Sequence, residues 1–270
     1  MKQDPKYLGG GFGVGWKERM DLVDEVKPND LSSINIVVKE GNNLVGYNTD
    51  AEGFVRSLEE KFEEIGKKME RSNFIILGAG GVAKEVGKFL AKKKANKISI
   101  LNRSYEKAVK IANELNDKHG RIATGDGEDV IRGKILNSYT VPDAIINLTD
   151  KGSDGPLVEY SSFHMANPKS EDLKTDIGNN ISASRTIARE LKRLNPNVII
   201  ADIVLPKNPP SKTLAVAKNE GLENIVDGIG MVVYQAVPAY LKVQEANPDK
   251  HENKVSEEKA LEIFKVSAGM

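Results

Sequence analysis

The chain has 270 residues, enough for one large domain or two smaller ones. Its 39 lysine and arginine residues balance 39 acidic residues, so bulk charge favours neither nucleic acid nor a membrane surface as a partner. Cysteine is absent, which excludes disulfides, a thiol nucleophile and a thiolate metal site. No apolar run approaches the ~20 residues that span a bilayer, and the first twenty residues lack the apolar core of a secretory signal. We therefore expect a soluble, cytoplasmic globular protein.

The first part of the chain predicts a few small elements after a glycine-rich start at residues 1–16. Apolar spacing favours a helix that stops before Pro28. Two strands around the polar turn Gly41-Asn42-Asn43 are typical of a hairpin. In chain order, the predicted elements are a helix over 17–26, strands over 34–38 and 44–47, and a helix over 50–65.

From residue 73 onward, short apolar runs alternate with helical patterns. Short apolar runs of this kind are typical of buried parallel strands. The runs lie at 73–77, 97–101, 144–147, 198–202 and 224–226, and the helices at 82–95, 105–115, 182–194, 231–245 and 256–266. This alternation predicts an α/β fold with a doubly wound parallel sheet, the Rossmann architecture.

The turn after the first of these strands matches the pattern G-x-G-x-x-A at residues 78–83. It directly follows an apolar strand and directly precedes a helix, the context in which this pattern binds a dinucleotide. Such glycines permit a tight turn and let backbone amides approach the pyrophosphate at the helix N-terminus. The alternative is a glycine-rich turn that binds nothing. The predicted cofactor-binding residues here are Gly78, Ala79, Gly80, Gly81 and Val82.

The end of the second strand indicates which dinucleotide is bound. NAD-binding domains usually place Asp or Glu near this point to bond the ribose 2′-hydroxyl. This chain instead has Asn102, Arg103 and Ser104, with Lys107 one helical turn further on. Because a guanidinium binds a phosphate bidentately and a carboxylate would repel it, the sequence favours NADP as the cofactor. The alternative is that Arg103 and Lys107 merely solvate the start of a helix.

Six short motifs, in order, resemble those of the shikimate dehydrogenase family, including its quinate/shikimate relatives. The resemblance covers most of residues 13–245, and its most specific parts are G-x-N-T-D-x-x-G and G-x-x-M-x-x-Q. The matching segments are Gly13-Val14-Gly15-Trp16-Lys17-Glu18, Ser33-Ile34-Asn35-Ile36, Gly46-Tyr47-Asn48-Thr49-Asp50 with Gly53, the Gly78 turn with Asn102-Arg103-Ser104, Asn147-Leu148-Thr149 with Gly152, and Gly228-Ile229-Gly230-Met231 with Tyr234-Gln235.

The resemblance implies roles that the residues alone do not. By themselves, Lys17 could be a solvated charge and Asp50 a helix N-cap. In the family, Lys17 and Asp50 would face each other across the cleft as the catalytic pair. Lys17 would donate a proton to the carbonyl oxygen of 3-dehydroshikimate as hydride arrives from NADPH, and would accept it back in reverse. The implied substrate-binding residues are Asn35, Asp50 and Gln235, and Thr149 and Gly228 would lie against the cofactor.

The chain also departs from the family pattern. Only sixteen residues precede Lys17, and they contain no S-x-S element of the kind that holds the substrate carboxylate. We therefore expect a small, truncated α/β substrate domain that has lost its first strands. Trp16 follows Gly15 where the family has T-x-P, and it is either a pocket residue or a core anchor. Leu205 replaces the tyrosine of D-x-V-Y.

Together these patterns predict a truncated substrate domain over 1–50, an NADP-binding Rossmann domain with its connecting helix over 51–245, and a C-terminal helical segment over 246–270 that returns toward the small domain. The predicted function is reversible hydride transfer between NADPH and 3-dehydroshikimate, in the chorismate route to aromatic amino acids. The alternatives are a non-catalytic or regulatory NADP-binding module and a dehydrogenase for another small cyclic hydroxy acid.

Two further expectations concern metals and assembly. His119, His164 and His251 are scattered without ligand spacing, so the sequence predicts no metal site. A shortened small domain would expose a sheet edge, and a homodimer is one assembly that would cover it.

Overall fold

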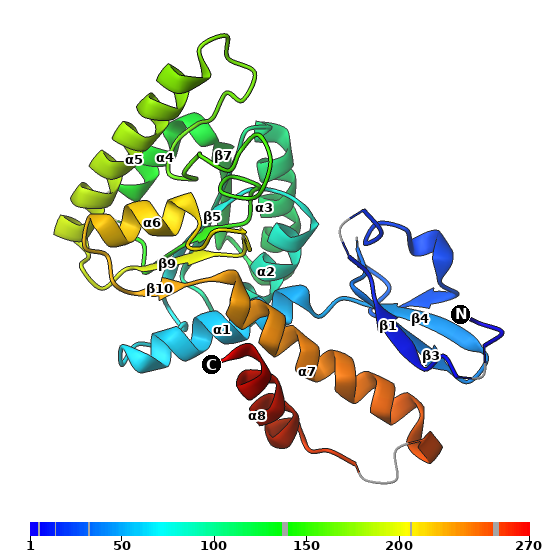
Figure 1. Ribbon diagram of the computed structural model, residues 1–270. Coiled ribbons are helices and arrows are strands. Elements are labelled where there is room, and N and C mark those ends of the chain that lie inside the picture. Colours follow the sequence, from blue (N-terminus) through cyan, green and yellow to red (C-terminus); the bar gives the residue numbers. More distant parts are fainter. Residues whose placement is uncertain (5, 14, 32, 137–139, 206, 251–253) are drawn as a thin grey trace. The chain divides into compact units, whose positions relative to one another are not determined.

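The computed structural model describes residues 1–4, 6–13, 15–31, 33–136, 140–205, 207–250 and 254–270. These residues form two compact units, one of residues 1–54 with 230–270 and one of residues 55–229 (Figure 1). The structure groups residues 230–245 with the N-terminal sheet, whereas the sequence analysis assigned them to the nucleotide-binding domain. Val14 and His251 lie outside the described residues.

The unit of residues 55–229 is built on a six-stranded parallel sheet with the order β10-β9-β8-β5-β6-β7. This confirms the predicted doubly wound sheet. The chain runs from the central β5 outward through β6 and β7, then returns to the other side of β5 and continues through β8, β9 and β10. The strands are β5 Asn73–Leu77, β6 Lys97–Asn102, β7 Ala123–Gly127, β8 Ala144–Asn147, β9 Ile199–Asp202 and β10 Ile225–Val226.

Because the strand order reverses between β5 and β8, their carboxyl ends lead into loops that diverge. In open α/β sheets, ligands bind in the crevice at this point. The register pairs Leu77 at the end of β5 with Asn147 at the end of β8. The Gly78 turn and the Asn147-Leu148-Thr149 segment therefore start next to each other at the sheet, before the two loops diverge.

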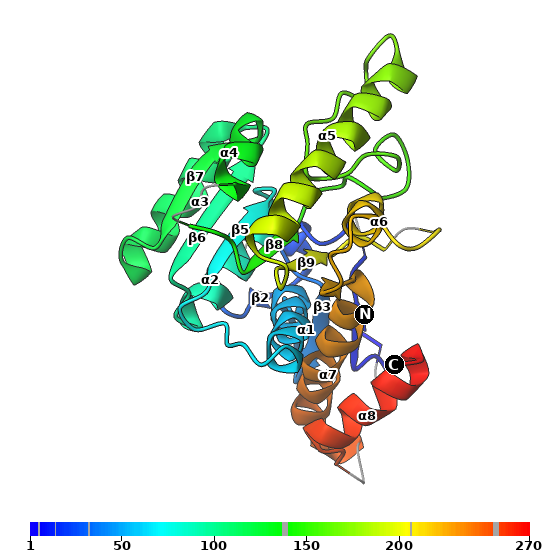
Figure 2. The same cartoon turned by 90° about the vertical axis from the view of Figure 1, so that its left-hand side faces the viewer.

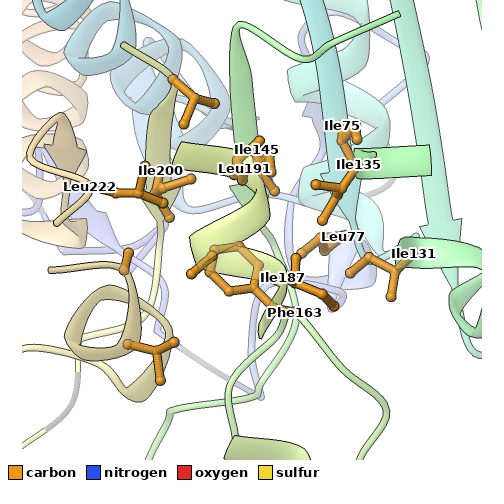
Figure 3. Packing of buried hydrophobic residues seen from close by; sticks show 14 of the residues in the cluster. Ile75, Leu77, Ile131, Ile135, Ile145, Phe163, Ile187, Leu191, Ile200 and Leu222 are labelled. Atoms are coloured by element: carbon orange, nitrogen blue, oxygen red, sulfur yellow. The ribbon is translucent and has the colours of Figure 1, made fainter. Parts of the chain in front are cut away.

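Helices cover both faces of this sheet (Figures 1 and 2). One face carries α4, α5 and α6, and its core contains alternate strand residues such as Ile75, Leu77, Ile145 and Ile200 (Figure 3). Phe74, on the opposite face of β5, packs against Phe62 of α1. The helices are α1 Asp50–Glu64, α2 Gly81–Lys92, α3 Tyr105–His119, α4 Ile131–Ile135, α5 Leu173–Leu194 and α6 Lys212–Asn219.

Strand β7 is an element that the sequence analysis missed. Its residues, Ala123 to Gly127, include a single apolar side chain. A Cβ on Gly125 would lie 2.4 Å from backbone atoms of Ala108 and Val109 in α3, so the helix backbone packs directly on the strand. The side chain of Asn116 also binds the amides of Ile122 and Ala123. Close backbone packing therefore replaces the apolar pattern that usually indicates a strand.

The unit of residues 1–54 and 230–270 contains a mixed four-stranded sheet with the order β1-β3-β4-β2. The predicted hairpin is confirmed as β3 and β4, and Gly41 adopts φ +60° in the turn between them. The expectation that this domain has lost its first strands is not confirmed, since the N-terminal residues supply β1 and β2. The strands are β1 Gly9–Gly11, β2 Glu25–Val26, β3 Ile36–Glu40 and β4 Asn43–Tyr47.

The predicted helix over residues 17–26 is wrong. This segment forms only a short 3₁₀ turn, Met20–Leu22, followed by strand β2, which pairs in parallel with β4. The amide of Asp24 donates to the carbonyl of Leu44, and the Asp24 carboxylate accepts from the amide of Leu44. Pairing with the sheet therefore outweighs a helical spacing that covers fewer than three turns.

Two C-terminal helices complete this unit. Helix α7 spans Gly228–Ala246, so its first residues belong to the other unit, and α8 spans Glu257–Ala268. Ser256 caps α8 by accepting from the amide of Lys259, and Gly269 ends the helix in the left-handed conformation. The rings of Tyr240 and Phe264 meet edge to face and join the two helices.

The buried cluster of the larger unit provides a test of the sheet arrangement. Ile200→Ala on β9 should lower the free energy of unfolding by about 3 kcal/mol, because it removes a fully buried side chain and leaves a cavity. The control Val266→Ala, at an exposed position of α8, should change stability by less than about 0.5 kcal/mol. Urea denaturation measures both, and equal effects of the two substitutions would contradict the assigned core.

Candidate active site

The Gly78 turn has a geometry that only glycine permits. Gly78 has φ +112°, and a Cβ there would lie 2.7 Å from the carbonyl oxygen of Leu148 and 3.2 Å from the side chain of Thr149. The Gly78 amide donates to the carbonyl of Leu101 at the end of β6. The turn is therefore packed between the ends of its two neighbouring strands.

The next glycine faces open space instead. No atom lies within 4 Å of the Cβ position of Gly80, which precedes α2 as its N-cap residue. No side chain caps the helix there, and its first turn contains no acidic residue. The amide donors at the start of α2 are thus available, together with the positive end of the helix dipole, to an anionic group.

The loop after β6 adds positive charge at the same edge of the sheet. Arg103 and Lys107 are exposed, and neither has an ion partner within the part of the chain that the structure describes. The side chain of Asn102 donates to the carbonyl of Ser104, which precedes α3. Free amides, an open glycine turn and two unpaired cations form a donor set that fits the phosphates of a dinucleotide.

Behind the crevice lies a buried polar network that the sequence analysis did not predict. The fully buried Asp202 carboxylate accepts from Asn147 Nδ2 at 2.9 Å, from the Val204 amide at 3.0 Å and from Ser211 Oγ at 2.6 Å. Asn147 Oδ1 in turn accepts from Thr149 Oγ1 at 2.6 Å. The network therefore links the end of β9 to Thr149, the predicted cofactor-binding residue.

Burial dominates the ionisation of Asp202. It raises the pKa of this carboxyl to about 7, although hydrogen bonds from Ser211, Val204 and Asn147 oppose the shift. No cation contacts the carboxylate among the partners that the structure gives it.

Gly228, also predicted to lie against the cofactor, begins helix α7 close to the end of β9. A Cβ there would lie 2.6 Å from the carbonyl oxygen of Ile203 and 3.0 Å from the side chain of Leu205. The absence of a side chain at this position lets the start of α7 approach the β9 loop.

In the other unit, Lys17 and Asp50 form an ion pair with 2.5 Å between Nζ and Oδ2. The Lys17 side chain is 29% exposed and that of Asp50 only 3%. Lys17 is held in place because its carbonyl accepts from the Ile34 amide, next to β3. Asp50 is the first residue of α1. The two residues are thus direct partners within one unit.

Asn35 is the centre of this cluster. Its Oδ1 accepts from the Thr49 amide at 2.8 Å, which fixes the orientation of its side-chain amide. Its Nδ2 then donates to Asp50 Oδ1 at 2.8 Å and to Gln235 Oε1 at 2.5 Å. The side chain of Asn35, which directly precedes β3, therefore joins Asp50 of α1 to Gln235 of α7.

Gln235 reaches Asn35 because two helices pack unusually closely. A Cβ on Gly53 of α1 would lie 2.4 Å from the Gln235 amide nitrogen in α7. Any larger residue at position 53 would push the backbone of α7 away. Gly53 thus sets the spacing that places Gln235 beside Asn35 and Asp50.

Known proteins match this chain in both sequence and structure. The model of the family described as Shikimate / quinate 5-dehydrogenase matches residues 59–203. A shikimate dehydrogenase (NADP(+)) of Alkaliphilus oremlandii is 30% identical over 238 residues, which cover 85% of this chain and 71% of that protein. The chain belongs to the shikimate/quinate 5-dehydrogenase family. It is therefore an oxidoreductase of this family, acting on CH–OH groups.

Solved structures of the same fold differ in what they bind and reduce. A shikimate 5-dehydrogenase of Listeria monocytogenes, solved with shikimate and NAD, has a TM-score of 0.67 at 21% identity, and the match covers 95% of this chain and 77% of that one. A 5-ketofructose reductase of Gluconobacter has a TM-score of 0.59 at 24% identity, covering 97% and 79%.

Two departures from the family pattern are both at the surface. Trp16, next to Lys17, is 55% exposed, so the alternative that it anchors the core is wrong. Its ring lies 6.0 Å from the guanidinium of Arg19. Leu205, which replaces the family tyrosine, is 52% exposed. Neither side chain is needed to fill the interior, and both are free to contact another molecule.

The predicted site residues line neither of two cavities in the larger unit. Cavities of about 300 and 580 Å³ lie in residues 55–229, and neither is lined by a predicted site residue. Within the described residues, no group of three or more His, Asp or Glu side chains could hold a metal ion. In the same residues, no helix is both long and apolar enough to cross a membrane.

The raised pKa of Asp202 predicts a pH-dependent stability. Between about pH 4 and pH 7 the unfolded chain has released this proton while the folded protein still holds it, so stability should fall as pH rises through this window. Asp202→Asn cannot titrate, and its amide can donate to Ser211 Oγ.

We expect the variant to lose this part of the pH dependence when unfolding is measured by urea titration from pH 4 to pH 8. Asp117→Asn, at an exposed position of α3, is the control and should leave the profile unchanged. An unaltered slope in Asp202→Asn would show that Asp202 does not keep its proton.

Proposed function

We propose that the protein is an NADP-dependent oxidoreductase of the shikimate dehydrogenase type. It would transfer hydride reversibly between NADPH and 3-dehydroshikimate, as in the chorismate route to aromatic amino acids. The observation that carries the proposal is the cluster in which Lys17, Asp50, Asn35 and Gln235 are hydrogen-bonded to one another. In this proposal residues 1–54 with 230–270 bind substrate and residues 55–229 bind the cofactor.

Lys17 is the proposed general acid. When a carbonyl carbon accepts hydride, negative charge develops on its oxygen, and a nearby ammonium lowers the barrier by donating a proton. Lys17 is partly exposed, and its ammonium has hydrogens beyond the one directed at Asp50. Asp50 keeps the ammonium positioned through the hydrogen bond that it accepts. Bound NADPH would supply the hydride, and in the reverse direction Lys17 would take the proton from the alcohol.

Substrate hydroxyls would be recognised by the same cluster. Gln235 uses Oε1 to accept from Asn35, and its Nε2 has no partner within the described residues. That amide nitrogen is therefore a donor for a hydroxyl oxygen. Asn35 already donates both of its amide hydrogens, to Asp50 and to Gln235. We propose that it orients these two side chains, and that a substrate hydroxyl would share the hydrogen bonds that Asn35 donates to them.

NADP is the proposed cofactor because of the unpaired Arg103 and Lys107 beside Asn102 and Ser104. Residues 102–105, at the end of β6 and directly after it, contain no carboxylate that would repel a 2′-phosphate. Gly78 to Val82 would hold the pyrophosphate on the amides at the start of α2. Thr149 and Gly228 would border the remainder of the cofactor. The A. oremlandii relative carries NADP(+) in its name, whereas the Listeria structure contains NAD.

A second candidate is a dehydrogenase for another small cyclic hydroxy acid or polyol. The exposed Trp16 and Leu205 favour it, because both alter surfaces where the family has other residues. The similar fold of a 5-ketofructose reductase is consistent with such a change. A panel of shikimate, quinate and cyclic polyols, assayed with NADP and with NAD, decides between the substrates.

The non-catalytic alternative makes a different prediction in a binding experiment. Calorimetry with NADP, with and without shikimate, should give two binding events if the proposal holds. Binding of cofactor alone, together with no turnover of any panel member, would support the non-catalytic module. The chain's single tryptophan, Trp16, lies next to Lys17, so its fluorescence gives an independent record of substrate binding.

Lys17→Ala tests the proposed acid. We expect kcat to fall by about 10²- to 10⁴-fold, the usual contribution of general acid catalysis, while the Kd for NADPH stays within a factor of two or so. Lys2→Ala, which removes an exposed lysine of the same unit, is the control and should be fully active. Retained turnover in Lys17→Ala would rule out this mechanism.

Arg103→Gln tests the cofactor preference. Loss of a charge-assisted contact to the 2′-phosphate should reduce kcat/KM for NADPH by about 10- to 100-fold and leave that for NADH nearly unchanged. Arg121→Gln, an exposed arginine of the same unit, is the matched control. If both cofactors are affected equally, Arg103 does not read the phosphate.

A further inference from the structure

Lys151 is a buried lysine that the proposed mechanism does not use. It lies in the loop after β8, and its side chain is only 9% exposed. Its Nζ donates to Glu128 Oε2 at 2.9 Å and to the carbonyl of His164 at 2.8 Å. Burial lowers the pKa of Lys151, the charge of Arg103 acts in the same direction, and Glu128 opposes both. A buried ammonium persists where such partners hold it.

The backbone of Lys151 is also fixed, by the residues that precede it. Its carbonyl accepts from Asn147 Nδ2 at 3.1 Å, and its amide donates to Thr149 Oγ1 at 3.2 Å. The carbonyl of Leu148, in the same loop, is the group that lies against Gly78. The loop that Lys151 ends therefore forms one wall of the predicted dinucleotide turn.

The two partners of Lys151 come from different parts of the chain. Glu128 directly follows β7, the neighbour of β6, whose end leads into Arg103. His164 lies in the segment before α5, and its carbonyl also accepts from Asn180 Nδ2 of that helix. One ammonium thus ties the start of the loop after β8 to the residue that follows β7, and also to a later part of the same loop that Asn180 bonds to α5.

A cavity lies beside the two partners of Lys151. Glu128 and His164 line a cavity of about 300 Å³ together with Ile131 and Ile187, whose side chains belong to α4 and α5 (Figure 3). Without the ammonium, the Glu128 side chain has room to turn away. The loop would then keep its bond to Asn147 and the bond from the Gly152 amide to the Leu157 carbonyl, but it would lose its direct bond to the residue that follows β7.

We propose that Lys151 is a positioning residue for the dinucleotide site: its bonds to Glu128 and His164 hold the loop in which Leu148 and Thr149 border Gly78. The inference rests on the proposed function only in requiring that this site binds a dinucleotide. Lys151 does not itself touch the cofactor in this proposal, so its loss should weaken cofactor binding and spare the chemical step.

The test is Lys151→Met, which keeps much of the side-chain volume but cannot donate. We expect the Kd and KM for NADPH to rise about tenfold, the size of effect that a side chain acting on a site through others can have. The kcat at saturating NADPH should stay within about twofold of wild type by the same reasoning. Lys151→Arg can donate to both partners and should recover most of the affinity.

Lys134→Met is the matched control. Lys134 pairs with Asp126 of β7 at 2.7 Å, at the same edge of the sheet, but it has no bond to the loop after β8. Its replacement should leave the Kd for NADPH unchanged. An equal loss of affinity in Lys134→Met would overturn the specific role of Lys151.

The double variant Glu128→Gln/Lys151→Met covers the case in which the single variant does not fold, since it leaves no partly buried carboxylate unpaired. It should unfold at nearly the wild-type midpoint and still bind NADPH about tenfold more weakly. A double variant with wild-type affinity would overturn the proposal. If the wild-type protein binds neither NADPH nor NADH by calorimetry, the proposed function and this inference are both overturned. If the wild-type protein binds and Lys151→Met has the same affinity, the inference alone is overturned.

Discussion

The close approach of Gly78 to the Leu148 carbonyl is the contact on which the larger unit's site depends. It occurs where the strand order reverses, between the adjacent strands β5 and β8. The loops that follow these two strands are in contact at this point and then run to opposite sides. A side chain at position 78 would occupy the space of that carbonyl. Because glycine is required there, the amides at the start of α2 face an opening. The other contacts at this edge of the sheet hold the loop after β8 in its position beside the Gly78 turn.

Polar groups that are buried or partly buried hold that second loop, and they are satisfied by partners within the loop and in neighbouring elements. Asn147 binds Asp202, Thr149 binds Asn147, and Lys151 binds Glu128. Such groups are costly to bury unless they are paired, and a paired network gives a loop one defined position. The small unit uses the same device, since Asn35 satisfies both of its amide groups by holding Thr49, Asp50 and Gln235. In both units the predicted chemistry depends on amides that fix carboxylates.

Much of the fold could be predicted from the sequence because strands β5, β6, β8 and β9 are short, mainly apolar runs between helical patterns. The polar strand β7 could not, because the contact of Gly125 with α3 has no signature in a single sequence. The spacing of residues 17–26 suggested a helix, but pairing of Asp24 with Leu44 draws the segment into the sheet. Local pattern is overridden where a partner distant in sequence supplies the hydrogen bonds.

The candidate site shows the same division between short-range and long-range information. Lys17, Asp50, Asn35 and Gln235 could be named from motifs, but nothing in those motifs says that Asn35 joins the other residues or that Gly53 sets their spacing. Lys151 could not be found at all, since a lysine beside a glycine in a loop has the appearance of a solvated charge. Its burial follows from Glu128 and His164, which lie 23 and 13 residues away. Residues predicted to touch a ligand are therefore accessible from sequence, whereas the residues that hold them in place become visible only when the chain is folded.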